Sequence, residues 1–149
     1  MNIQQYSGHI TPDILTLLLT ADPNEAELLG YIKTARVLVA MDLARVVGVA
    51  VITGCNQQQE LRNIAVESDW QGQGIAKALI AEVKVMAKES GADSLVVGTG
   101  NSSLSQMALY QKCGFRFFKI IPGFFAGYPE PIVENGIQCI DKVLLKFEF

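Results

Sequence analysis

The stretch that most constrains this chain lies at its centre, in residues 60–90. Residues 60–66 (ELRNIAV) alternate polar and apolar side chains as a half-buried strand does. A polar loop with two glycines, Gly72 and Gly74, follows, and residues 74–90 then repeat apolar side chains with helical spacing. A strand that runs through a glycine loop into a long helix predicts helices packed around one sheet.

The glycine loop has the chemistry of an anion site. The first turn of a helix leaves its backbone N–H groups without partners, and these groups carry the positive end of the helix dipole. Gly72 and Gly74 allow that backbone to approach an anion closely, so the loop suits a phosphate or pyrophosphate. The segment lacks the GxxxxGK(S/T) loop, and Lys77 stands where the third glycine of a dinucleotide fingerprint belongs. An ordinary helix start that contains glycines is the alternative at this point.

The remaining pattern divides the chain into helices and strands with no repeat, linker or low-complexity tract. Thr11 followed by Pro12 is typical of a helix start, and Gly91 and Gly114 are typical of helix ends. Residues 122–136 are expected to form a loop rich in aromatic side chains, proline and glycine. One domain over residues 1–149 with a mixed α/β architecture is therefore predicted. We expect helices at residues 13–20, 24–33, 74–90 and 103–113, and strands at residues 36–41, 46–53, 60–66, 94–99, 115–121 and 137–149.

Composition and charge exclude several classes of protein. Hydrophobic residues make up 50% of the chain, which excludes a disordered protein. The formal net charge is −3, without the basic stripe of a nucleic-acid-binding protein. The apolar runs fall short of the ~20 residues that cross a bilayer, and the first residues lack the pattern of a secretory signal. We therefore expect a cytoplasmic protein without nucleic-acid or membrane partners.

Cysteine and histidine are too few for a disulfide framework or a metal cluster. Cys55, Cys113 and Cys139 lie far apart, their number is odd, and no CxxC pair occurs. His9 is the single histidine, so a metal site would lack its commonest ligand. We expect no metal ion, and we expect buried or half-buried thiols in a reducing compartment.

Two motifs, in the right order, resemble those of the GNAT superfamily of N-acetyltransferases. Gln71, Gly74 and Ala76 match its acetyl-CoA signature, (R/Q)-x-x-G-x-(G/A), directly after the predicted strand. Residues 109–115 (LYQKCGF) match its second signature at the expected distance, and the resemblance is strongest over residues 60–118. It implies a single-domain GNAT fold of the α/β (α+β) class. That fold has a mixed, mostly antiparallel sheet of six to seven strands, splayed central strands and about four helices.

The resemblance implies acetyl-CoA as cosubstrate and assigns residues to it. Backbone N–H groups of the glycine loop would hold the pyrophosphate, which agrees with the physical argument from the helix start. The strand before the loop would pair its backbone with the pantetheine arm. Asn101 would bond that arm or else cap the next helix. The implied cofactor-binding residues are Ile64, Ala65, Val66, Gln71, Gly72, Gln73, Gly74, Ile75, Ala76, Asn101 and Tyr110.

Tyr110 and Glu60 resemble the catalytic residues of the superfamily. A phenol, with a reference pKa of about 10, is protonated at neutral pH and can give its proton to a leaving thiolate. Tyr110 would be this general acid, and a tyrosine of the core is the alternative. Glu60 would take the proton of the acceptor amine, often through water, and a surface charge beside a polar turn is the alternative. A backbone N–H near Val66 would stabilise the oxyanion.

The acceptor side is the part that the resemblance fixes least. Acceptor specificity would come from the N-terminal helices and from residues 123–131, whose aromatic side chains would line an amine pocket, and Glu130 or Glu134 would attract a cation. A dimer contact, or a lid over the core, is the alternative for this loop. The candidates for substrate binding are Phe124, Phe125 and Tyr128.

Three functions follow from these expectations. The first is transfer of the acetyl group of acetyl-CoA to a primary amine, expected to be that of a small molecule, by direct attack in a ternary complex. The second is transfer to an amine of a protein or peptide, and the third is a non-catalytic acyl-CoA-binding module. A homodimer, in which the apolar strand at residues 143–149 pairs across an interface, is a further expectation.

Overall fold

A seven-stranded sheet organises the computed structural model, which describes residues 1–54 and 56–149. Its strands are β1 (Asn2–Tyr6), β2 (Arg36–Asp42), β3 (Arg45–Thr53), β4 (Gln58–Val66), β5 (Ser94–Gly100), β6 (Arg116–Ile121) and β9 (Lys142–Glu148). They lie in the order β1-β2-β3-β4-β5-β9-β6. The pair β4–β5 is parallel, and the other neighbours are antiparallel. A separate two-stranded sheet joins β7 (Val133–Glu134) and β8 (Ile137–Gln138).

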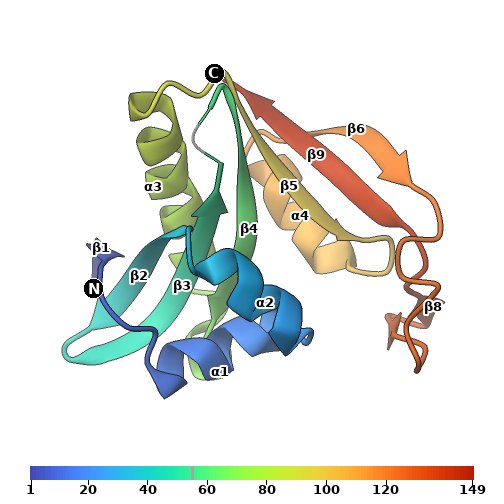
Figure 1. The fold of residues 1–149 in the computed structure, drawn as a ribbon, viewed down its shortest axis with the longest axis horizontal. Coiled ribbons are helices and arrows are strands. Elements are labelled where there is room, and N and C mark those ends of the chain that lie inside the picture. The colour runs from blue at the N-terminus through green and yellow to red at the C-terminus, as the bar shows by residue number, and fades with distance from the viewer. Residues whose placement is uncertain (55) are drawn as a thin grey trace.

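Helices cover both faces of the large sheet (Figure 1). On one face, α1 (Pro12–Ala21) and α2 (Glu25–Ile32) bury Leu17, Leu18 and Leu28 against β2 and β3. On the other face, α3 (Ile75–Glu89) and α4 (Leu104–Lys112) pack into the larger core cluster. A short 3₁₀ turn, η1 (Ser68–Trp70), lies between β4 and α3. The described residues thus form a three-layer α/β architecture with one apolar core on each side of the sheet.

The centre of the sheet opens between β4 and β5. The two strands pair only along residues 58–61 of β4 and 94–97 of β5. Figure 1 shows them together near the C-terminus and apart at their other ends. In the β3–β4 ladder, Val51 pairs with Asn63 but Ile52 pairs with Leu61, so Arg62 is an extra residue in a β-bulge. A bulge bends its strand, and β4 leaves β5 at this point.

The element boundaries confirm most of the pattern expected from the sequence. Thr11 caps α1 through its side chain with proline in the first turn, as predicted. Gly91 has a left-handed backbone after α3, which is the predicted helix end. The fold class is also confirmed, with seven strands in a mostly antiparallel sheet and four α-helices among the described residues.

Two features differ from expectation, and one prediction falls outside the described residues. Strand β1 was not expected, because its polar sequence NIQQY has only a weak apolar pattern; its pairing with β2 makes it a strand. The single strand expected at residues 137–149 is divided, since β8 pairs with β7 and only β9 joins the large sheet. Cys55, expected as a buried or half-buried thiol, lies outside the described residues.

The expected pairing of residues 143–149 across a dimer interface is wrong. Strand β9 lies between β5 and β6, so both of its edges are already hydrogen-bonded within the sheet. The free edges of the large sheet belong to β1 and β6. A strand with two neighbours has no backbone groups left for a third.

We expect the core beneath α3 to dominate stability. Leu79 is fully buried in the larger core cluster, so Leu79→Ala should lower the free energy of unfolding by about 2–5 kcal/mol. Val85 lies on the exposed side of the same helix, so Val85→Ala should change it by no more than about 0.5 kcal/mol. Urea unfolding of both variants tests this. Equal losses would contradict the assigned face of the helix.

Candidate active site

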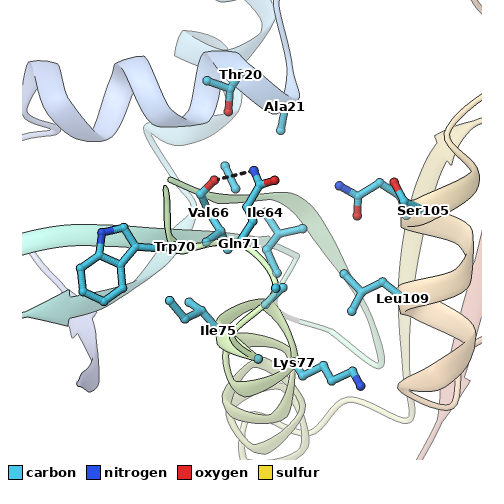
Figure 2. A pocket seen from close by; sticks show the side chains of 15 residues that line it. Thr20, Ala21, Ile64, Val66, Trp70, Gln71, Ile75, Lys77, Ser105 and Leu109 are labelled. Carbon is cyan, nitrogen blue, oxygen red and sulfur yellow. Dashed lines mark hydrogen bonds between the residues drawn. The ribbon is translucent and has the colours of Figure 1, made fainter. Parts of the chain in front are cut away.

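A cavity of about 560 Å³ lies where β4 has left β5. Its walls come from the end of β4, the glycine loop, the start of α3, the facing side of α4 and the end of α1 (Figure 2). Lys77 is the one charged residue among those that line it. The lining residues are Thr20, Ala21, Ile64, Ala65, Val66, Trp70, Gln71, Gly72, Gly74, Ile75, Ala76, Lys77, Ser105, Gln106 and Leu109.

The glycine loop presents backbone donors to this cavity. Gly72 and Gly74 have φ angles of 77° and 83°, in the left-handed region that favours glycine. The first bond inside α3 runs from the Ala78 N–H to the Gly74 carbonyl, at 3.0 Å. The N–H groups of residues 75–77 precede that bond and have no acceptor inside the helix. The loop is therefore built to receive an anion at the positive end of α3.

The side chain of Gln71 ties this loop to the open edge of β4. Its Nε2 donates a hydrogen bond of 3.0 Å to the Val66 carbonyl (Figure 2). The next residue, Glu67, donates its N–H to the Val47 carbonyl on β3, so Val66 points its own backbone groups away from β3. The bond fills one of the positions that a β5 neighbour would otherwise occupy, and it fixes the loop relative to the strand.

A second cavity of about 390 Å³ adjoins the first. Both are lined by Thr20, Ala21, Ile64 and Gln106, so they meet between α1, β4 and α4. The second cavity is acidic, with four carboxylates against two cationic side chains. The charged residues are Asp22, Glu27, Glu60, Glu134, Arg62 and Lys142.

Tyr110 lines the second cavity from α4, and its neighbour Leu109 lines the first. The Tyr110 side chain is 4% exposed, and its ring lies 6.0 Å from that of Phe115. Burial, and then the nearby Cys113 thiol, hold the pKa of Tyr110 well above its ordinary value. The phenol therefore keeps its proton at neutral pH, which suits a proton donor.

Glu60 lines the same cavity from β4, close to where the β3–β4 bulge begins. Arg62, two residues on, forms an ion pair with Glu27 of α2 at 2.5 Å, and its guanidinium lies 4.4 Å from the centre of the Tyr31 ring. Glu60 thus lies on the wall of a pocket, while its role as a base stays a prediction.

The aromatic loop, residues 122–136, forms a second wall of this cavity. Phe124, Phe125 and Tyr128 all line it, as expected from the sequence. Their rings meet edge to face, with centroids 4.9 Å apart for the first pair and 5.6 Å apart for the second. Lys142 Nζ lies 4.7 Å from the Phe124 ring centre. Glu134 also lines the cavity, while Glu130 lies outside it.

A hydrogen-bonded chain joins β4 to the helices above it. Asn63 Nδ2 donates to the Leu18 carbonyl at 3.2 Å and to the Tyr31 hydroxyl at 3.1 Å. Tyr31 donates in turn to Asp22 at 3.1 Å, and burial raises the pKa of Tyr31 to about 12. Among the described residues, two buried side-chain atoms have no hydrogen-bond partner, Asn63 Oδ1 and Gln106 Oε1. Both residues line the second cavity.

Two residues expected at the cofactor site lie away from the cavities. Gln73 lines neither cavity. Asn101 lines neither, and its side chain holds the 138–141 segment instead: Oδ1 accepts from the N–H groups of Ile140 and Asp141, at 2.8 and 3.0 Å. Its Nδ2 donates to the Gln138 carbonyl at 3.1 Å. The N-cap position of α4 falls on Ser103, not on Asn101.

Sequence reasoning assigned acceptor specificity to the N-terminal helices but did not name the individual residues that reach the site from α1, α2 and α4. Thr20, Asp22 and Glu27 come from segments without a motif, and only the tertiary fold brings them to β4. Gln106 and Leu109 carried a signal that was available, since they lie within one helical turn of Tyr110. Among the described residues, no group of three or more histidine, cysteine, aspartate or glutamate side chains is arranged to hold a metal ion.

Comparison with known families decides what this arrangement is. The model of the acetyltransferase (GNAT) domain family matches residues 33–117, which include strands β2 to β5, the glycine loop and Tyr110. The chain belongs to the GNAT acetyltransferase family. It is therefore an acyltransferase, and both sequence motifs lie at the cavities. A curated relative, the uncharacterized N-acetyltransferase YvbK of Bacillus subtilis, is 42% identical over 97% of each chain.

Solved GNAT structures share the whole fold. A GNAT family acetyltransferase from Elizabethkingia anophelis, solved with acetyl-CoA bound, is 39% identical with a TM-score of 0.92 over 99% of this chain and 97% of its own. A protein from Bacillus cereus named an IAA acetyltransferase is 42% identical with a TM-score of 0.91 over 99% of each chain. In the described part of this GNAT chain, no helix is long and apolar enough to span a membrane.

The raised tyrosine pKa values predict a loss of stability at high pH. The folded protein holds the protons of Tyr31 and Tyr110 more tightly than the unfolded chain does. Their contribution to the free energy of unfolding is therefore complete below the unfolded pKa of about 10 and is lost as pH rises above it. At pH ~11 the free energy of unfolding should fall by about 1 kcal/mol through Tyr110, and Tyr110→Phe should remove that part of the loss.

Urea unfolding at pH 8 and pH 11 measures this, and absorbance at 295 nm reports tyrosinate directly. Tyr110 ionising near pH 10 in the folded protein would contradict the burial argument.

Proposed function

We propose that this protein transfers the acetyl group of acetyl-CoA to a primary amine of a small molecule, by direct attack in a ternary complex. The observation that carries the proposal is a pair of adjoining cavities with opposite electrostatic character. One has a helix N-terminus and a lysine and suits a polyphosphate. The other has an excess of carboxylates and suits an amine.

In this proposal the first cavity holds acetyl-CoA. The backbone N–H groups of residues 71–76 receive the pyrophosphate, and Ile64, Ala65 and Val66 carry the β4 edge along which the pantetheine arm lies. Support comes from the unpaired part of β4, whose backbone groups beyond residue 61 lack a β5 partner. Asn101 contributes by holding residues 138–141 in place.

The reaction needs two proton transfers. The amine nitrogen attacks the thioester carbonyl carbon, a C–N bond forms, and the C–S bond breaks. Glu60 takes the proton that the amine gives up, directly or through water, and Tyr110 gives its proton to the leaving thiolate. The Val66 N–H stabilises the oxyanion. Tyr110 fits because it lines the second cavity, its neighbour Leu109 lines the first, and its hydroxyl is protonated.

A small acceptor is favoured over a protein by the shape of the second cavity. Phe124, Phe125 and Tyr128 form a wall that faces the α1–α2 region, and the cavity volume of about 390 Å³ fits a compact molecule. A protein or peptide amine is the second candidate. An acyl-CoA-binding module without activity is the third, and the presence of both Tyr110 and Glu60 in one cavity argues against it.

We also propose a cytoplasmic location and a homodimer. Cys113 and Cys139 are free thiols, which suits a reducing compartment. The edge strand β6 exposes apolar side chains, with Phe117 52% and Ile120 60% exposed. An exposed apolar edge strand is a surface on which a second copy can pair.

Substitution in the glycine loop tests the cofactor site. Gly74→Glu puts a carboxylate where the pyrophosphate would lie, so CoA affinity should fall by at least about tenfold. Gly91→Glu is the matched control, because Gly91 also has a left-handed backbone with open space around it, at the other end of α3. Its CoA affinity should stay within about twofold.

Calorimetric titration with CoA compares the two variants, and circular dichroism checks their folding. Unchanged affinity in a folded Gly74→Glu protein would remove the loop from the site.

A panel of acceptors tests the reaction itself. CoA thiol release from acetyl-CoA should occur with small amines, above a control without acceptor. The panel contains alkylamines, polyamines, aminoglycosides, amino acids, peptides with free amines, and IAA, the compound in the name of the Bacillus cereus relative. Release with peptides alone would support the second candidate, and silence across the panel in a protein that binds CoA would support the third.

Tyr110→Phe then tests the proton donor. With the best acceptor, turnover should fall by about 100-fold while CoA affinity stays within about twofold, since a general acid contributes to the chemical step and not to binding. Tyr6→Phe, which changes a tyrosine outside both cavities, is the control. Equal turnover in the wild type and Tyr110→Phe would exclude Tyr110 from the mechanism.

A further inference from the structure

The four carboxylates of the second cavity differ in their partners. Glu27 is neutralised by its ion pair with Arg62. Glu134 accepts hydrogen bonds from the hydroxyls of Ser102 and Ser103, at 3.1 and 3.0 Å. Asp22 accepts from the Tyr31 hydroxyl at 3.1 Å and from the Asn24 N–H at 3.2 Å. The donors to Asp22 are neutral, so they hold its carboxylate in place without cancelling its charge.

Asp22 and Glu60 reach the cavity from different elements. Asp22 follows the C-terminal end of α1, in the turn before α2, while Glu60 lies on β4 ahead of the bulge. In the described part of the chain, the ion pairs are Arg62–Glu27 and Arg45–Glu67, so neither Asp22 nor Glu60 has a cationic side chain bound to it. The cavity therefore offers two separate negative positions.

Asn63 provides an independent sign of a ligand near Asp22. The side chain is 5% exposed, lines this cavity, and is linked to Asp22 through the Tyr31 hydroxyl. Its Nδ2 must face the Leu18 carbonyl, because an oxygen there would meet another acceptor. Its Oδ1 is consequently fixed without a donor. An unpaired buried acceptor is costly, and the N–H of a bound cation would satisfy it.

The aromatic wall completes this end of the cavity. Tyr128 lines the cavity together with Asp22 and Glu27, and burial, followed by the charges of these two carboxylates, raises the pKa of its hydroxyl. The Tyr128 ring contacts that of Phe125, which in turn contacts that of Phe124. Aromatic faces attract cations, and here they adjoin a carboxylate without a cationic partner.

We infer that the acceptor is a diamine or polyamine, whose distal ammonium binds at Asp22 and Asn63 while its reacting amine lies at Glu60 and Tyr110. This inference rests on the proposed function, because it names the acceptor class of the same site. A monoamine would leave the charge of Asp22 without a counter-charge and Asn63 Oδ1 without a donor. An amino acid would bring its carboxylate into an acidic cavity.

Matched amines test the second binding position. The acceptors are n-butylamine, 1,3-diaminopropane, putrescine and cadaverine, which differ in the presence and distance of the second ammonium. The best diamine should exceed n-butylamine in kcat/KM by about tenfold, as a charge-assisted hydrogen bond gives. Equal values for all four would overturn the inference while leaving the proposed acetyl transfer intact.

Asp22→Asn removes the charge and keeps the shape and an oxygen acceptor for Asn24. It should lower kcat/KM for the diamine about tenfold, mainly through KM, and change that for n-butylamine less than twofold. Glu130→Gln is the control, because Glu130 is an exposed carboxylate of the aromatic loop outside the cavity. An equal loss for both amines in Asp22→Asn would overturn the subsite.

A binding measurement separates this inference from the proposed function. If no amine is acetylated, calorimetry of putrescine with the CoA-loaded wild type and with Asp22→Asn still decides the subsite. Binding that Asp22→Asn abolishes would support a diamine site without transfer. Absence of binding to the wild type would overturn both the subsite and the amine acceptor.

Discussion

The structure depends on an interrupted hydrogen-bond ladder. Strands β4 and β5 share bonds for four residues each and then part at the bulge of Arg62. On the side that faced β5, the backbone groups of β4 beyond that point have no strand neighbour, although every buried N–H and carbonyl needs a partner. The Val66 carbonyl accepts a hydrogen bond from the side chain of Gln71, and residues 64–66 line the first cavity. The binding site is therefore a consequence of how the sheet is built and not a later addition to its surface.

The two cavities show how one fold separates opposite charges over a short distance. The glycine loop and the N-terminus of α3 concentrate positive potential in the first cavity. Carboxylates from the α1–α2 region, β4 and β7 concentrate negative potential in the second. Strand β4 contributes Ile64 to both cavities and α4 contributes Gln106, so an anionic donor and a cationic acceptor can meet without either crossing a region of like charge.

What the sequence could predict was set by local patterns. The glycine loop, its helix and Tyr110 were found because a left-handed turn, a 3.6-residue period and a short motif are visible within a few residues. The role of Asn101 was not predicted, because it depends on residues 138–141, whose turn has no sequence signature. The same holds for Asp22, Asn63 and Tyr31, which are 9 to 41 positions apart and join only through tertiary packing. Strand β1 shows that an edge strand can be missed, since its pairing with β2 forms the strand although its sequence has only a weak apolar pattern.

Asn101 and Glu134 attach the wall that the aromatic loop forms, and the segment after it, to the core at a few fixed points. Asn101 holds residues 138–141, Glu134 binds Ser102 and Ser103 at the start of α4, and Asp141 accepts from the Gly123 N–H at 2.9 Å. Between these anchors the aromatic side chains of residues 124–128 make no hydrogen bond on which the cofactor side depends. The wall is thus a replaceable module: its side chains can be exchanged by evolution or by an engineer to change the shape of the second cavity, provided that the anchors are kept.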